Sequence, residues 1–237
     1  MLEYLRIAVA SATLLYTSYL DLKTREVDDK VWLVAGAFGL LVNLPDLIWK
    51  PADIIPYLLS IGATAGVAFS LYFVGLYGGA DAKALTCLSA IHPFSRYGVQ
   101  LHGIVGLTTF TNGMLLSALL PISLALYNSY RLVRGEEIFE GFESEPGYRK
   151  FFALFIGTRV MRSSGKRFWS PVEKRAGGVK RFTFNITIDD MDEAFEDDMW
   201  ITPGIPLLVF FTAGYLLSLV FGDFMGQIFH FFTRLPG

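Results

Sequence analysis

Long apolar segments separated by short polar turns run through most of the chain. A helix needs about 20 residues to cross the hydrocarbon core of a membrane, and six segments reach or approach that length. They cover residues 5–20, 31–47, 54–77, 82–94, 103–127 and 205–221. The pattern predicts a polytopic α-helical membrane protein with about six transmembrane helices. The second segment is short for a full crossing because Asn43, Pro45 and Asp46 interrupt it, and the fourth because His92 and Pro93 interrupt it.

Residues 128–200 have a different pattern, with charged and polar positions throughout. Apolar and polar side chains alternate over residues 181–188, as in a half-buried strand. Gly177 and Gly178 precede this strand as a turn, and residues 166–170 are its candidate partner. We therefore expect a small cytosolic α+β insertion between the fifth and sixth helices. Thr202 and Pro203 are expected to be the N-cap and first-turn proline of the last helix.

This organisation divides the chain into three parts. Residues 1–127 are expected to form a transmembrane region with five helices, residues 128–200 the insertion, and residues 201–237 the last helix with a C-terminal tail. The composition agrees with a membrane protein, because 53% of the residues are hydrophobic, 18% are charged and the mean hydropathy is +0.45.

The positions of the basic residues predict the orientation. With the amino terminus outside, all but four of the 20 lysines and arginines fall on the inner side. Basic residues are enriched on the cytoplasmic side of membrane proteins, although long loops count for less. Within the insertion the basic residues alternate with acidic ones and lie next to membrane helices, which favours contact with lipid headgroups over nucleic acid.

Two features of the apolar segments predict packing. Gly62 and Gly66 form a GxxxG pattern, which allows a neighbouring helix to approach closely. The single cysteine, Cys87, lies in an apolar run, has no partner for an internal disulfide, and is expected to be a small buried residue.

Asp21 and Asp81 are the candidate chemical groups. Each lies at the edge of an apolar segment, where an ionisable side chain is costly, and both face the cytoplasm in the predicted orientation. Two neighbouring carboxyl groups can share a proton, so that one acts as a base and the other as an acid. Two structural alternatives stay open: Asp81 is also a plausible helix N-cap, and Asp21 an exposed interfacial residue. Asp28 and Asp29 are expected to stay charged in the polar turn.

Other catalytic classes lack support in the sequence. His92, His102 and His230 are scattered and do not have the spacing of a zinc-binding helix. The glycines of residues 75–79 lack the lysine and hydroxyl residue of a phosphate-binding loop.

Three segments carry a resemblance to a known family. They are residues 21–27 (Asp-Leu-Lys-Thr-Arg-Glu-Val), residues 78–83 (Gly-Gly-Ala-Asp-Ala-Lys) and residues 202–206 (Thr-Pro-Gly-Ile-Pro). Together they resemble the archaeal type IV prepilin and preflagellin (archaellin) peptidases, which are membrane aspartic proteases of the GxGD type. The chain departs from the GxGD pattern at Ala80, where the family has glycine.

The resemblance implies an aspartic endopeptidase without metal or cofactor. Its substrates would be preflagellin and type IV prepilin-like precursors, from which it removes a short basic leader at the cytoplasmic membrane face. Asp21 and Asp81 would be catalytic. The backbone of the catalytic loop and the candidate pKa or substrate contacts would be Gly78, Gly79, Ala80, Lys83, Arg25 and Glu26.

Two further hypotheses concern recognition and rival functions. Acidic clusters at residues 136–145 and 189–198 are candidates for attracting the basic leader. The rivals are another GxGD protease, which cuts membrane helices or signal peptides, and a small transporter with functional acids. The transporter is disfavoured because both aspartates lie at segment ends on one side and the chain has no internal repeat.

Overall fold

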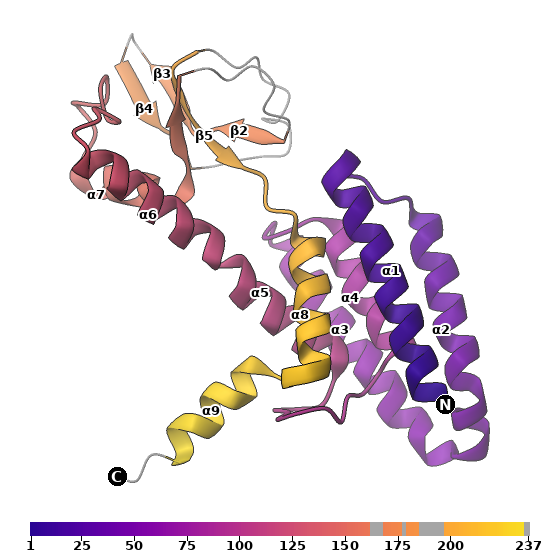
Figure 1. Cartoon of the computed structure of the whole chain (residues 1–237). Helices are drawn as coiled ribbons and strands as arrows, with labels where there is room; N and C mark the ends of the chain where they lie inside the picture. The colour runs from indigo at the N-terminus through magenta and orange to yellow at the C-terminus, as the bar shows by residue number, and fades with distance from the viewer. Residues whose placement is uncertain (162–167, 177–178, 185–196, 235–237) are drawn as a thin grey trace. The chain divides into compact units, whose positions relative to one another are not determined.

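The computed structural model describes residues 1–161, 168–176, 179–184 and 197–234. They form two compact units (Figure 1), of which unit 1 comprises Met1–Ser117 and Pro206–Gly237, and unit 2 comprises Ala118–Ile205. Unit 1 is helical, whereas unit 2 combines helices with short strands. The predicted architecture, mostly helical with a small sheet region, is confirmed.

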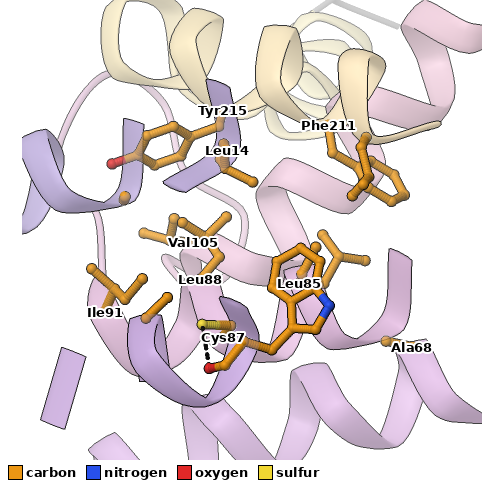
Figure 2. Close-up of a cluster of buried hydrophobic side chains, with 14 of the residues drawn as sticks. Leu14, Ala68, Leu85, Cys87, Leu88, Ile91, Val105, Phe211 and Tyr215 are labelled. Carbon is orange, nitrogen blue, oxygen red and sulfur yellow. Dashed lines mark hydrogen bonds between the residues drawn. The ribbon is translucent and has the colours of Figure 1, made fainter. Parts of the chain in front are cut away.

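Unit 1 is a bundle of apolar helices. They are α1 (Leu2–Thr24), α2 (Asp29–Trp49), α3 (Ile54–Phe73), α4 (Gly79–Ile91), α5 (Val105–Ser117), α8 (Leu207–Phe221) and α9 (Phe224–Arg234), with a short 3-10 turn η1 (Pro51–Asp53) before α3. Helix α4 lies at the centre, because it packs against α1, α2, α3, α5 and α8. Figure 2 shows how Leu14 of α1, Leu85 and Leu88 of α4, and Phe211 and Tyr215 of α8 meet in the core.

Three helices of the described chain are long and apolar enough to cross a membrane: Asp29–Trp49, Pro51–Phe73 and Val105–Val133. Leu207–Phe221 is apolar but shorter. Large apolar side chains such as Leu33, Leu58 and Phe73 are exposed on these helices. Exposed apolar surfaces of this extent are typical of contact with lipid. The chain is therefore a membrane protein, and the number of six crossings stays a prediction.

Helix α2 continues through the polar residues that were expected to interrupt it. Pro45 lies inside the helix, which ends at Trp49 and not at residue 47. Asn43 is buried, and its side-chain amide donates hydrogen bonds to Gly39 O, Ala90 O and Ile91 O at 2.8–3.0 Å. Because its N–H groups are hydrogen-bonded, the Asn43 side chain can be buried without interrupting the helix. The same amide binds the last carbonyl groups of α4. Helix α4 covers Gly79–Ile91 and not residues 82–94, because it ends before His92 and Pro93.

Unit 2 contains α6 (Leu119–Val133), α7 (Gly147–Ile156) and two small sheets. The first sheet is antiparallel, with the strand order β1 (Thr158–Val160), β5 (Met199–Pro203), β2 (Trp169–Pro171). The second is a hairpin of β3 (Glu173–Ala176) and β4 (Val179–Phe182). Aromatic side chains form the core, in which Phe182 stacks on Phe142 at 4.2 Å between ring centroids and Trp200 is fully buried.

The strand pairing differs from the prediction. The partner of the strand that contains Arg181 is Glu173–Ala176, whereas Trp169–Pro171 pairs with β5. The shorter connection explains the difference, because two strands joined through Gly177-Gly178 form a local hairpin. Strand β4 ends at Phe182, so the predicted strand does not continue through Thr183 and Phe184, and Phe168 lies in a turn before β2. Residues 166–167 and 185–188 of the two predicted strands lie outside the described part of the chain.

The prediction that Thr202 and Pro203 begin the last helix is wrong. Both residues belong to β5, where Pro203 lies opposite Trp169 and Thr202 opposite Ser170. The Thr202 hydroxyl donates to Ile156 O and therefore does not cap a helix. Helix α8 begins four residues later, at Leu207, with Pro206 in the capping position.

The GxxxG pattern of α3 has no close neighbour among the described residues. A Cβ atom added to Gly62 or Gly66 would meet nothing within 4 Å. Close helix contacts occur elsewhere in unit 1, at Gly113 of α5 and Gly214 of α8. Cys87 is buried as predicted, with its Sγ atom 3.7 Å from Trp32 O.

Candidate active site

Asp21 lies in the last turn of α1. The helix ends at Thr24, because Arg25 takes a left-handed conformation (φ 59°, ψ 14°) and its backbone N–H donates to Asp21 O. The Asp21 side chain is 13% exposed, and its Oδ1 atom is 3.7 Å from Nη1 of Arg25. Within the described part of the chain its buried Oδ2 atom has no hydrogen-bond partner. The open alternative of an exposed interfacial aspartate is therefore excluded.

Asp81 is the third residue of α4, which begins after the turn at Gly78. Its Oδ2 atom accepts a hydrogen bond of 3.1 Å from the backbone N–H of Gly78. An acidic side chain three residues after the N-cap commonly satisfies a free N–H in this way. Gly78, and not Asp81, is the N-cap residue. This bond leaves the carboxyl group in a fixed orientation at the helix start.

The two carboxyl groups are close enough to interact. Helix α1 packs directly on α4 in unit 1. Burial raises the pKa of Asp81 to about 7, and the negative charge of Asp21 adds to the shift. Burial also raises the pKa of Asp21, while Arg25 opposes that rise. A pair in which one carboxyl keeps its proton near neutral pH has the electrostatics of an acid and a base.

The glycine turn before α4 has no positive φ value at Gly78 or Gly79. Gly78 has φ −77° and Gly79 is helical; the left-handed glycine of this turn is Gly75, with φ 81°. Small size matters more at both positions, because an added Cβ would lie 3.3 Å from Asp81 Oδ2 at Gly78 and 3.4 Å from the Tyr72 ring at Gly79. Ala80 is already in helical conformation, which suits alanine, so the departure from GxGD has no backbone cost.

Lys83 and Glu26 do not contribute to the carboxyl pair. The Nζ atom of Lys83 binds Oδ1 of Asp29 at 2.6 Å. Lys83 is not among the groups that shift the pKa of Asp81. Glu26 is exposed beside Thr24, whose hydroxyl donates to its carbonyl oxygen. Asp28 caps α2 by accepting a hydrogen bond from Lys30 N. Of the three candidate contact residues, only Arg25 lies beside an aspartate of the pair.

Neutralising Lys83 is therefore expected to have little effect on the carboxyl pair. The pair with Asp29 is largely exposed, and exposed ion pairs contribute roughly 0–1 kcal/mol. We expect the rate of the Lys83→Gln variant to stay within about fivefold of wild type, the factor that corresponds to about 1 kcal/mol. A steady-state rate assay in membranes checks this, and a larger loss would mean that Lys83 reaches the site in the working enzyme.

The sequence did not reveal the role of the first turn of α8. The backbone N–H of Leu208 faces the Asp21 carboxyl group and lowers its pKa. The same turn is tied to α1 through the Ser18 hydroxyl, which donates to Leu208 O at 2.9 Å. The only hint of this contact in the sequence was segment 202–206, which carries part of the family resemblance and directly precedes α8.

The acidic residues of the insertion are largely paired within unit 2. Glu136 binds Arg131, Glu140 and Asp198 bind Arg159, and Glu145 binds Arg149. Glu145 also accepts a hydrogen bond from Phe182 N. These contacts stabilise the insertion and leave few free acids in the cluster at residues 136–145. Residues 189–196 of the second cluster lie outside the described residues.

Comparisons with known proteins identify relatives of this chain. The model of the type IV leader peptidase family matches residues 8–123, which include both aspartates, and that of the archaeal peptidase A24 C-terminus, type II, matches residues 149–224. The preflagellin peptidase of Methanococcus maripaludis is 24% identical, over 94% of this chain and 96% of that protein. That of Methanocaldococcus jannaschii is also 24% identical, over 93% and 95%.

Proposed function

Since this chain belongs to the type IV leader peptidase family, we propose that it is a membrane aspartic endopeptidase that removes the leader peptide from preflagellin and type IV prepilin-like precursors. The observation that carries the proposal is the position of Asp21 in the last turn of α1 and Asp81 at the start of α4, two helices that pack together and bring the two carboxyl groups within range of each other. The curated relatives that match nearly the whole chain are preflagellin peptidases, which supports the substrate.

The carboxyl pair can hydrolyse a peptide bond without another cofactor. The ionised carboxylate takes a proton from a water molecule, which attacks the scissile carbonyl carbon. The protonated carboxyl donates a hydrogen bond to the carbonyl oxygen and stabilises the charge that develops there. When the tetrahedral intermediate collapses, the C–N bond breaks, and the carboxyl that took the proton from water gives it to the leaving amine nitrogen. Asp81 fits the acid because burial and the charge of Asp21 raise its pKa to about 7, so that much of it stays protonated near neutral pH and nearly all of it in acidic solution.

The membrane arrangement that we propose has six crossings, with the amino terminus outside and both aspartates at the cytoplasmic face. The crossings are residues 5–20 of α1, α2, α3, residues 82–91 of α4, the helix of residues 105–133 and α8, so that Asp21 and Asp81 lie just outside the membrane-spanning segments. Helix α4 has only 13 residues, about 20 Å at 1.5 Å per residue. It is surrounded by other helices, which support a short segment inside the bilayer. A leader at the cytoplasmic surface would then meet the pair while the apolar helix of the precursor stays in lipid.

Residues 128–200 form a cytosolic insertion in this arrangement, and its aromatic residues support contact with the lipid surface. Tyr127 and Tyr130 are exposed near the end of α6, and Arg134 lies 4.7 Å above the Tyr130 ring. Tyr148 and Phe151 are exposed on the neighbouring helix α7. Aromatic and basic residues are enriched at membrane interfaces.

A reconstituted cleavage reaction tests the function. Membranes that contain the protein are mixed with a preflagellin precursor, and the amino terminus of the product is sequenced. We expect one cut between the basic leader and the apolar helix. Cuts within the apolar helix would instead support an intramembrane protease, and no cleavage of any precursor would contradict the proposal.

The pH dependence gives a further prediction. As the pH rises through about 7, Asp81 loses its proton. The pair then loses its acid, and kcat/KM is expected to fall about tenfold per pH unit on the alkaline side, because the protonated fraction falls tenfold. Initial rates between pH 5 and 9 measure this, and a rate that is constant up to pH 9 would contradict the role of Asp81.

A further inference from the structure

Asp21 lies where an ionised carboxylate is electrostatically unfavourable. It is mostly buried in the last turn of α1, where the helix dipole disfavours negative charge, and the second carboxyl group is nearby. If Asp21 is to act as the base, other groups must stabilise its charge. Three groups face it: the Asp81 carboxyl from α4, the Leu208 backbone N–H from α8, and the Arg25 guanidinium from the end of α1 itself.

Arg25 holds an unusual backbone conformation at this position. Its φ of 59° lies in the left-handed region, which glycine normally occupies at a helix end. For any other residue this region is strained, because the Cβ atom comes too close to the following carbonyl oxygen. The conformation turns the chain back so that Nη1 comes within 3.7 Å of Asp21 Oδ1, with the Arg25 side chain only 23% exposed. A strained residue whose side chain reaches an active-site group suggests a functional constraint.

The guanidinium acts unequally on the two carboxyl groups. It is the largest influence that lowers the pKa of Asp21, but the smallest of those that act on the pKa of Asp81. The Asp81 carboxyl group accepts a hydrogen bond from the backbone N–H of Gly78. Tyr77 is a further titratable group close to Asp81. The nearby lysines have other partners: Lys83 binds Asp29, and Lys23 lies over the Tyr19 ring.

We propose that Arg25 is a positioning residue that keeps Asp21 ionised and oriented as the base, so that the shared proton stays on Asp81. The first turn of α8 assists by presenting the Leu208 N–H to the same carboxylate. This inference rests on the proposed peptidase function and gives each aspartate of the pair one role. Arg25 itself does not need to touch the substrate.

The test compares Arg25→Gly with Arg25→Lys. Glycine suits the left-handed conformation, so Arg25→Gly is expected to fold at least as well as wild type while it lacks the positive charge. Arg25→Lys keeps a charge on the same strained backbone. The readout is the pH profile of kcat/KM for precursor cleavage, with the thermal unfolding midpoint of each purified protein as the measure of folding.

We expect the acidic limb of Arg25→Gly to move to higher pH by about one unit, since a nearby opposite charge lowers a carboxyl pKa by one unit or more. The alkaline limb should move less, and Arg25→Lys should restore most of the acidic limb. Lys23→Gln, which removes a charge two residues away, is the matched control and should give the wild-type profile.

Two results would overturn the inference. One is an Arg25→Gly profile with wild-type midpoints and uniformly lower rates, which would assign Arg25 a structural role. The other is an acidic limb displaced equally in Arg25→Gly and Arg25→Lys, which would mean that the charge is not responsible. Failure of the wild-type protein to cleave any precursor would instead refute the proposed function.

Discussion

Asp21→Asn and Asp81→Asn are each expected to reduce the rate of precursor cleavage by about 10²–10⁴-fold, the usual contribution of a general acid or base. Asparagine keeps the shape of the side chain but can neither accept a proton from water nor donate one as an acid. At position 81 the amide oxygen can still accept the hydrogen bond from Gly78 N, so the start of α4 should be preserved. The loss should therefore appear in the rate and not in the amount of folded protein.

Asp29→Asn provides the matched control for these two variants. Asp29 lies on the same side of the bundle and is exposed, with Lys83 as its partner. The same chemical change there should leave cleavage near the wild-type rate. If either Asp21→Asn or Asp81→Asn cleaves as fast as Asp29→Asn, the carboxyl pair is not the catalytic unit.

Gly214→Ala is expected to destabilise the bundle that positions the pair. A Cβ at Gly214 would lie 2.7 Å from the backbone nitrogen of Gly113, and backbone cannot move aside as a flexible side chain can. Overpacking of this kind typically costs about 1–3 kcal/mol. Because Leu208 lies on the same helix and faces Asp21, separating α8 from α5 should also lower the cleavage rate. The thermal unfolding midpoint of the purified protein measures the first effect.

Gly62→Ala is the control for this substitution. It adds the same methyl group to a helix of the same unit, but nothing lies within 4 Å of the added atom. Alanine is favoured over glycine inside a helix by roughly 0.5–1 kcal/mol. We expect an unchanged or slightly higher unfolding midpoint, and equal losses in both variants would contradict the close contact of α5 and α8.

Helices α1 to α5 and α8 of unit 1 could be predicted from the sequence because their apolar segments are bounded by local turn residues. Helix α9 was missed, since residues 224–234 were expected to be part of a C-terminal tail. Asp21 and Asp81 could be selected because a carboxyl group at the edge of such a segment needs a physical reason. The end of α2 was misplaced because Asn43 and Pro45 resemble breaks locally. Their compatibility with the helix depends on carbonyl groups of α4 that are distant in sequence.

Contacts between distant segments could not be predicted in the same way. The pairing of Trp169–Pro171 with Met199–Pro203 joins segments about 30 residues apart, and Thr202-Pro203 has the local pattern of a helix start. Lys83 follows Asp81 closely in sequence but binds Asp29 across a helix pair. The proximity of Leu208 to Asp21 arises only when α1 and α8 pack together.

The most direct test of the carboxyl pair is a comparison of Asp21→Asn, Asp81→Asn and the double variant in one cleavage assay, with enough enzyme to measure the slow rates. Residues that act as one unit have strongly non-additive effects. We therefore expect the cleavage rate of the double variant to be at most about threefold lower than that of either single variant. A double variant that is slower by the product of the two single losses would contradict this expectation, because the two aspartates would then act independently.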